Sequence, residues 1–233
     1  MTTGLARFRH IAVEGPIGAG KTTLAQRLAR HLGAEALLEQ PAENPYLERF
    51  YRDRAGYALQ TQLAFLFQRV RQMEAVAQPS VFGRALVSDF LFAKDAIFAR
   101  LNLGDEEHRL YRQIYAQLAP QVPEPDVVVW LQAPAPTLLQ RVRRRGIPME
   151  RAIDAPYLER LADAYTEYFS GYGAAPVLVV ATERFNPAED DRDFARLVDG
   201  LAGLDGRRAW LGVDAGLGFG AEVDLPLEAP GGT

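Results

Sequence analysis

Cysteine is absent from this sequence of 233 residues, and lysine is almost absent. Without cysteine, the chain has no disulfide framework and no metal site built from thiolates, so we expect a cytoplasmic protein. No apolar run approaches the roughly 18 residues of a membrane helix, and the N-terminus lacks a signal-peptide pattern, so we expect no membrane partner. A net charge of −4 argues against a general binder of nucleic-acid polymers.

Lysine is scarce although positive charge is not. Of the 26 basic residues, 24 are arginines, so a replaceable cation would be expected to be an arginine. Lys21 nevertheless lies in Gly-Pro-Ile-Gly-Ala-Gly-Lys-Thr at residues 15–22, which fits the phosphate-loop pattern G-x-x-x-x-G-K-[ST]. A compact ammonium can reach between phosphate oxygens where a planar guanidinium is too wide. The motif predicts a nucleoside triphosphate site rather than an empty glycine-rich turn. The expected nucleotide-binding residues here are Gly15, Gly18, Ala19, Gly20, Lys21, Thr22 and Thr23.

Short apolar runs alternate with longer segments of helical periodicity along the chain. We expect strands at 11–13, 36–38, 85–88, 127–131 and 177–181. We expect helices at 20–32, 46–53, 57–77, 91–102, 106–119, 135–145, 155–170 and 191–202. This alternation indicates an α/β fold, a doubly wound five-stranded parallel sheet with helices on both faces. Residues 1–203 would form this domain, and the Gly- and Pro-rich residues 204–233 would form a tail with at most one hairpin.

Polar residues follow three of the expected strands. The phosphate loop follows the first strand, Glu39 the second and Asp89 the third. Because ligands bind at the carboxyl ends of parallel strands, we expect these groups to meet in one crevice. There the Glu39 carboxylate could accept the proton of a hydroxyl that attacks a γ-phosphate. A solvated acid at a strand end is the open alternative.

Several separated motifs occur in an order that resembles the deoxynucleoside kinase family, closest to its bacterial deoxyadenosine/deoxyguanosine kinase branch. These motifs are the phosphate loop, Glu39-Gln40-Pro41, Asn44-Pro45-Tyr46-Leu47-Glu48, Gln62 through Arg69, Ser88-Asp89 and an arginine-rich segment. The resemblance covers about residues 9 to 203. It implies a P-loop kinase fold, ATP or GTP as phosphate donor, Mg²⁺ as the metal, and a deoxynucleoside 5′-hydroxyl as acceptor. It also implies a homodimer, or a heterodimer with a paralogue.

The resemblance further implies which residues hold the deoxynucleoside. Gln62, Arg69 and Asp95 would bind the base, while Tyr51 and Glu150 would contact the sugar 3′-hydroxyl. Gln62 and Arg69 are two helical turns apart and share one helix face, where a solvated polar stripe is the alternative. Tyr51 could equally be a core aromatic. Retention of Arg69 and Asp95 resembles the members that use purines or deoxycytidine rather than those that use thymidine.

The metal side of the expected site departs from the family. Thr22 and Asp89 would hold Mg²⁺, together with phosphates and water. Many members carry an arginine directly after the acid, whereas this chain has Phe90. Lys94, the second lysine, is a candidate for the missing charge, although Lys94 and Asp95 could also form a simple surface pair.

Four arginines within residues 141–145 form the densest positive cluster of the chain. Arg141 and Arg145 are four residues apart and share a helix face, and Gly146 is expected to end that helix. By the resemblance, residues 141–153 form a lid over the triphosphate. Arg145 would contact the transferring phosphoryl group, and Arg141 would pack on the donor base. A solvated helix face is the alternative.

We therefore expect a deoxynucleoside kinase of nucleotide salvage that acts on purine deoxynucleosides, with Glu39, Lys21 and Arg145 as catalytic residues. A nucleoside monophosphate kinase of the thymidylate type is the nearest rival, but a carboxylate facing the acceptor favours an uncharged hydroxyl. A non-catalytic nucleotide-binding subunit is the alternative of another class. A GTPase switch is disfavoured, because the sequence has no Asn-Lys-x-Asp motif.

Overall fold

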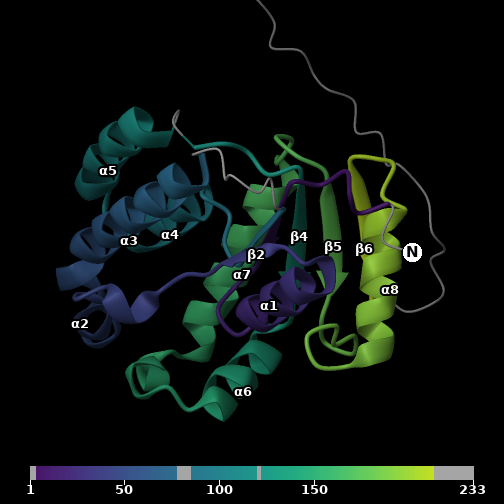
Figure 1. Cartoon of the computed structure of the whole chain (residues 1–233). Helices are drawn as coiled ribbons and strands as arrows, with labels where there is room; N and C mark the ends of the chain where they lie inside the picture. Colours follow the sequence, from purple (N-terminus) through teal and green to yellow (C-terminus); the bar gives the residue numbers. More distant parts are fainter. Residues whose placement is uncertain (1–3, 78–84, 120–121, 213–233) are drawn as a thin grey trace, which may run out of the picture.

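A parallel sheet of six strands forms the centre of the computed structural model, which describes residues 4–77, 85–119 and 122–212 (Figure 1). The strands lie in the order β2-β3-β1-β4-β5-β6. Their bounds are β1 His10–Glu14, β2 Glu35–Leu37, β3 Leu86–Ser88, β4 Val127–Gln132, β5 Val177–Ala181 and β6 Arg208–Leu211. The predicted doubly wound parallel α/β fold is confirmed, but the predicted number of five strands is wrong by one.

β6 is the strand that the sequence pattern missed. It pairs in parallel with β5, from Val177 opposite Arg208 to Val180 opposite Leu211. Only the last of its four residues is buried, whereas the first four residues of β5 are all buried. An edge strand with one buried side chain has almost no apolar pattern to detect. The sheet therefore extends into the segment predicted as a tail, and the rest of that segment, residues 213–233, lies outside the described residues.

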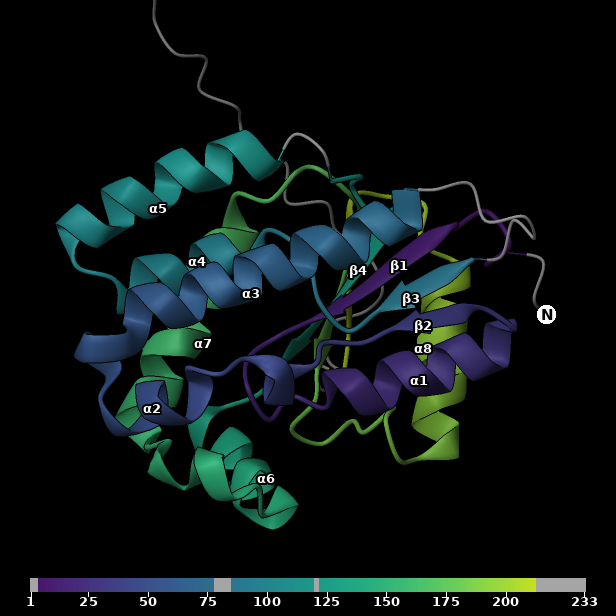
Figure 2. The ribbon, with the colours of Figure 1, turned by 60° about the vertical axis from the view of Figure 1, so that its left-hand side comes forward.

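The helices begin and end within a few residues of their predicted bounds. They are α1 Lys21–Leu32, α2 Leu47–Arg52, α3 Arg54–Ala77, α4 Lys94–Asn102, α5 Asp105–Leu118, α6 Ala135–Arg145, α7 Ala155–Ser170 and α8 Asp191–Ala202, with 3₁₀ turns η1 Pro41–Glu43 and η3 Pro148–Ala152. In Figure 2, α1 and α8 lie on one side of the sheet, and α3, α4 and α7 lie on the other. Within the described ranges, no helix is long and apolar enough to cross a membrane.

The central strands are buried because helices cover both of their faces. Val127 to Leu131 of β4 are all buried, as are Val177 to Val180 of β5. Such continuous apolar runs are typical of parallel strands covered on both sides. The chain leaves β1 for β2 and β3 on one side, then crosses to β4 on the other. The loops after β1 and β3 therefore open at a topological switch point, where α/β sheets bind ligands.

Candidate active site

The phosphate loop fills the six-residue connection from β1 to α1 and requires glycine. Gly18 has φ 88°, and a Cβ there would lie 2.7 Å from the carbonyl oxygen of Leu138. A Cβ on Gly15 would lie 2.5 Å from the carbonyl oxygen of Leu131. Only glycine combines this backbone geometry with such close approach. The loop is thereby pressed against β4 and α6, with its backbone curled around the start of α1.

Lys21 begins α1 and folds back over the loop. Its ammonium donates to the carbonyl oxygens of Gly15, at 2.8 Å, and of Pro16, at 3.2 Å. Burial and the nearby charge of Lys94 together lower the pKa of Lys21 to about 8, against the carboxylates around it. Carbonyl partners do not neutralise the ammonium. A bound polyphosphate would supply the anion that this charge lacks.

Asp89 connects the phosphate loop to the end of β2. It directly follows β3 and is 2% exposed. One carboxylate oxygen accepts a hydrogen bond from the Thr22 hydroxyl at 2.5 Å, and the other accepts from the Glu39 amide at 2.7 Å. Burial raises the pKa of Asp89, while these two hydrogen bonds oppose the rise. Hydrogen bonds of Asp89 thus join the segments that follow β1, β2 and β3.

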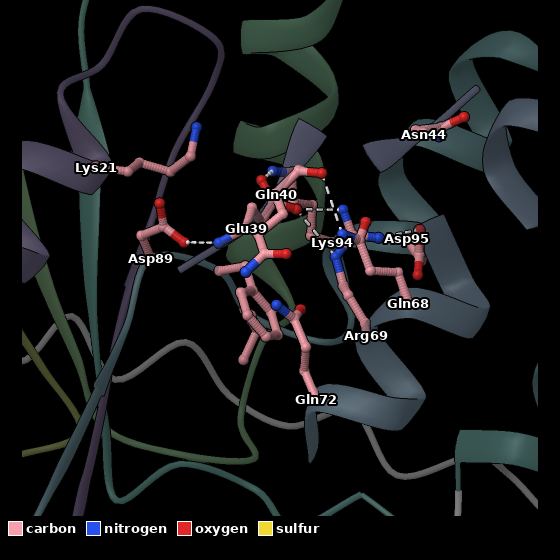
Figure 3. Close-up of polar contacts among 12 residues, drawn as sticks. Lys21, Glu39, Gln40, Asn44, Gln68, Arg69, Gln72, Asp89, Lys94 and Asp95 are labelled. Carbon is pink, nitrogen blue, oxygen red and sulfur yellow. Dashed lines mark hydrogen bonds and ion pairs between the residues drawn. The ribbon is translucent and has the colours of Figure 1, made fainter. Parts of the chain in front are cut away.

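The Glu39 carboxylate is held by two cations and does not lie in open solvent (Figure 3). One oxygen accepts from Arg69 Nε at 3.0 Å and Nη2 at 2.5 Å, and the other accepts from Lys94 Nζ at 2.7 Å. Burial alone would raise the pKa of Glu39, but Lys94 and Arg69 outweigh burial and hold it far below its usual value. The alternative of a solvated acid at a strand end is wrong, because the side chain is only 13% exposed.

The three residues expected to bind the base lie together between α3 and α4. Arg69 forms an ion pair with Asp95 on the side away from Glu39, and Gln62 donates to the Asp95 carbonyl at 3.3 Å. All three side chains are buried, so the alternative of a solvated stripe is wrong. Among the described residues, the second carboxylate oxygen of Asp95 and the hydroxyl of Tyr111 have no hydrogen-bond partner. Such buried, unpaired polar groups are what a hydrogen-bonding ligand would satisfy.

Lys94 and Asp95 do not form the surface pair that was the alternative for them. Both side chains are buried at the start of α4. They reach different partners, because Lys94 pairs with Glu39 and Asp95 pairs with Arg69. Figure 3 shows Lys21 and Asp89 on one side of Glu39, with Arg69 and Asp95 on the other.

The two residues expected to contact the sugar come from α2 and η3. Tyr51 is 9% exposed, and burial, Tyr157 and Glu150 together raise the pKa of its phenol. Glu150 belongs to η3, which contacts α2. Its carboxylate binds Arg145 at 2.6 Å. The structure therefore groups Tyr51, Glu150 and Arg145, although the sequence assigned the last two residues to different parts of the reaction.

The predicted lid consists of the end of α6 and the turn η3. α6 ends at Arg145, and Gly146 follows with φ 69°, as expected for a glycine helix cap. Arg141 donates to the Thr182 hydroxyl at 2.9 Å and to the Thr182 carbonyl. Arg144 pairs with Glu189 at 3.1 Å. Ion pairs and hydrogen bonds thus link the arginine cluster to η3 and to the segment after β5.

Glu14 is a buried acid that the sequence reading missed. Its carboxylate is fully buried at the end of β1 and accepts from the Gly15 amide at 2.7 Å and the Tyr165 hydroxyl at 2.9 Å. The other oxygen accepts from the Leu91 amide at 2.7 Å. Glu14 therefore ties the phosphate loop to the loop that carries Asp89. The signal for it was present, since a charged residue ends an otherwise apolar strand just before the glycines.

A metal site made of protein ligands alone is absent from the described residues, because no group of three or more His, Cys, Asp or Glu side chains could hold an ion. Thr22 and Asp89 nevertheless bring a hydroxyl and a carboxylate oxygen within 2.5 Å of each other beside the phosphate loop. Mg²⁺ prefers one or two such oxygen ligands, completed by phosphates and water. The residues present fit that pattern.

Comparison with known proteins agrees with this geometry. The family model described as deoxynucleoside kinase matches residues 11–202. The chain is 37% identical to the deoxyguanosine kinase of Bacillus subtilis over 156 residues, which are 66% of this chain and 75% of that protein. It is 30% identical to the deoxyadenosine/deoxycytidine kinase of the same species over 202 residues, 83% of this chain and 92% of that protein. The solved deoxyadenosine kinase from M. mycoides with bound dATP matches with a TM-score of 0.71 at 26% identity, over 82% of this chain and 98% of that one.

Proposed function

The chain belongs to the deoxynucleoside kinase family, and we propose that it transfers the γ-phosphate of ATP or GTP to the 5′-hydroxyl of a purine deoxynucleoside. It is a phosphotransferase that acts on a hydroxyl group. The observation that carries the acceptor assignment is the position of the Glu39 carboxylate. The backbone amide of Glu39 donates to Asp89, which also accepts from Thr22 of the phosphate loop. That arrangement supports a site in which the Glu39 carboxylate faces the same substrates as the phosphate loop.

Glu39 is the proposed base for the attacking hydroxyl. A carboxylate oxygen has two lone-pair sites, and in the described contacts Arg69 occupies both sites of one oxygen while Lys94 occupies one site of the other. One site therefore remains for the substrate hydroxyl. The depressed pKa of Glu39 suits a loose transition state, in which the hydroxyl proton leaves late and a weak base suffices.

Charge on the donor side comes from Lys21 and the lid. Lys21 would grip the phosphates within the loop, and Arg145 would leave Glu150 to contact the transferring group. Thr22 and Asp89 would hold Mg²⁺, which neutralises phosphate charge when bound. Arg141 would pack on the donor base beside Thr182, which it already contacts.

Gln62, Arg69 and Asp95 would bind the base, and Tyr51 and Glu150 would bind the sugar. The unpaired oxygen of Asp95 and the amide of Gln62 offer acceptors and donors to a base edge. A purine preference is supported by the relatives, which include deoxyguanosine and deoxyadenosine kinases. The deoxyadenosine kinase solved with dATP supports an adenine nucleotide as ligand of this fold.

The test is an assay of phosphorylation of the four deoxynucleosides and of thymidylate, with ATP and with GTP, by the wild type and by Glu39→Gln. We expect turnover of deoxyadenosine or deoxyguanosine, and a loss of about 10²–10⁴ in kcat for the variant with nucleotide binding retained. Glu43→Gln, an exposed acid in the same segment, is the matched control and should turn over normally. Phosphorylation of thymidylate but of no deoxynucleoside would instead support the monophosphate kinase rival. Near-normal turnover by Glu39→Gln would remove the base assignment.

A further inference from the structure

Both lysines of the chain lie in the same crevice. The sequence has 26 basic residues, of which only Lys21 and Lys94 are lysines. Lys21 belongs to the phosphate loop, and Lys94 donates to Glu39 at 2.7 Å. Positions where arginine would serve equally well carry arginine throughout this chain. The retained lysine at position 94 therefore points to a task for a compact ammonium.

Lys94 is buried, which requires an explanation. It is 6% exposed, at the first residue of α4. Removing an ammonium from water costs several kcal/mol unless other interactions offset the loss. Arg69 already binds Glu39 through two nitrogens, so the carboxylate would keep a cation even without Lys94. Arg69 is also shared with Asp95, so Lys94 is the second cation of a cluster with two carboxylates, and it binds the oxygen of Glu39 that Arg69 leaves free.

The charge balance of the crevice shows what Lys94 adds. The principal electrostatic partners of Lys21 and Lys94 are the carboxylates of Glu14, Glu39, Asp89 and Asp95 and the guanidinium of Arg69, so this set holds four carboxylates and three cations. The carboxylates already outnumber the cations by one. Without Lys94 the excess of negative charge would double, in a site that must receive a polyphosphate. Excess negative charge in a low-dielectric site repels the polyphosphate, and it therefore opposes both nucleotide binding and phosphoryl transfer.

We propose that Lys94 is the acceptor-side cation of the reaction, an inference that rests on the proposed function. The start of α4 fixes its position, because the adjacent Asp95 is held by Arg69. An ammonium has three N–H donors, and among the described residues Lys94 donates to Glu39 alone. One N–H orients the carboxylate towards the substrate hydroxyl. The other two N–H groups stabilise the negative charge that develops on the attacking oxygen and on the transferring phosphoryl group.

The absence of cysteine allows a direct chemical test. Lys94→Cys would carry the only thiol of the chain. Alkylation with 2-bromoethylamine converts that cysteine into a thioether of lysine length with a terminal ammonium, whereas iodoacetamide gives a neutral amide. Because the position is buried, the reaction is run in urea and followed by refolding, with the wild type taken through the same cycle. Lys94→Met, which keeps the stem and removes the charge, serves as a second variant if Lys94→Cys refolds poorly.

We expect Lys94→Cys and Lys94→Met to lose about 10²–10³ in kcat, with KM values for ATP and the deoxynucleoside changed only a few-fold. Aminoethylation should restore kcat at least tenfold, and carbamidomethylation should not. Equal recovery with both reagents, or a near-normal kcat for Lys94→Met, would overturn the inference. The wild-type arm separates the two levels of failure. An active wild type with an equally active variant overturns only the role of Lys94, whereas a wild type that phosphorylates no deoxynucleoside overturns the proposed function and this role with it.

Discussion

Charged side chains in the crevice depend on one another because most of them are buried. Glu39, Arg69, Lys94 and Asp95 form a chain of ion pairs in which each group has at least one partner of opposite charge. Breaking a buried pair by removing one partner typically costs 3–5 kcal/mol, because the other charge is left uncompensated. A loss of activity on substituting one of these residues therefore reports on the chemistry only if the variant is also shown to fold.

A separate prediction concerns His10 and the dependence of the free energy of unfolding on pH. His10 begins β1, its Nε2 lies 2.9 Å from the Ser88 hydroxyl oxygen, and its Nδ1 is buried without a hydrogen-bond partner among the described residues. Burial lowers the pKa of His10 from 6.5 to about 4, against the opposing charge of Asp126. Between these values the unfolded chain binds a proton that the folded chain does not. The free energy of unfolding should therefore fall as pH falls from 6.5 to about 4.

Urea denaturation at two pH values measures this effect. Lowering the pH from about 7.5 to 5 should reduce the free energy of unfolding by up to about 2 kcal/mol through His10 alone. His10→Gln should lose this part of the pH dependence. His31→Gln, at an exposed histidine, is the matched control and should keep the wild-type behaviour. An identical pH dependence for wild type and His10→Gln would contradict the assignment.

At the scale of elements, α3 and α4 together build the proposed base site. α3 carries Gln62 and Arg69, and α4 carries Lys94 and Asp95. The two helices pack against each other, so the ion pairs join their facing sides. Arg69 contacts the carboxylates of both Glu39 and Asp95. A change in either helix should therefore alter both the proposed base site and the position of the Glu39 side chain.

The double variant Arg69→Met with Asp95→Ala tests which base the helices select. It removes an ion pair as a unit, and Lys94 remains to hold Glu39. We expect kcat/KM for thymidine, relative to deoxyadenosine, to rise about tenfold or more, because a site built to hydrogen-bond one base edge is lost. Arg69→Met alone should be less stable than the double variant, because it leaves the buried carboxylate of Asp95 without its ion-pair partner. An unchanged ranking of the four deoxynucleosides would mean that this pair does not bind the base.

In the predicted lid, Arg145 pairs with Glu150, and the two side chains are 44% and 12% exposed. Two nitrogens of Arg145 reach the Glu150 carboxylate, so this pair is stronger than the contribution of about 0–1 kcal/mol that is typical of exposed ion pairs. The proposed contact of Arg145 with a phosphoryl group therefore has to replace a bidentate ion pair. Arg141 is held by Thr182 at two atoms, so one edge of the lid stays attached to the segment after β5.

At the scale of the whole molecule, β6 closes one edge of the sheet, far from the phosphate loop. β4 and β5 lie between it and β1. Leu211 of β6 is buried and contacts α8 at Gly200. Burying one leucine side chain contributes about 1.5–3 kcal/mol. The strand should therefore stabilise the fold without entering the chemistry.

A chain ended after Gly206 should melt about 5–10 °C lower than a chain ended after Gly212, since about 1 kcal/mol shifts the Tm of a domain of this size by about 2–4 °C. The comparison isolates β6, because both chains lack residues 213–233. Turnover at 25 °C should be similar for the two folded chains. Equal melting temperatures would show that β6 adds nothing to the sheet, and a selective loss of turnover would place it nearer the chemistry than its strand order indicates.

Local features were predictable from the sequence. Four of the five predicted strands, β1, β3, β4 and β5, are largely buried. They and the helices follow from apolar periodicity, because burial on both faces requires continuous apolar runs. The phosphate loop follows from glycines that must adopt positive φ and from the lysine after them. Glu39 and Asp89 could be brought to one crevice because parallel strands present their carboxyl ends at one edge.

Only the tertiary structure determined which charged groups meet. The pairing of Lys94 with Glu39, the unpaired hydroxyl of Tyr111 and the anchoring of two loops by Glu14 each join segments far apart in the sequence. The pairing of β6 with β5 is of the same kind. Periodicity reports how one segment faces the core, whereas an ion pair or an edge strand depends on the side chains and backbone of a second segment. The sequence could therefore predict where the site lies, whereas only the packing of distant segments determined which charged groups pair with one another.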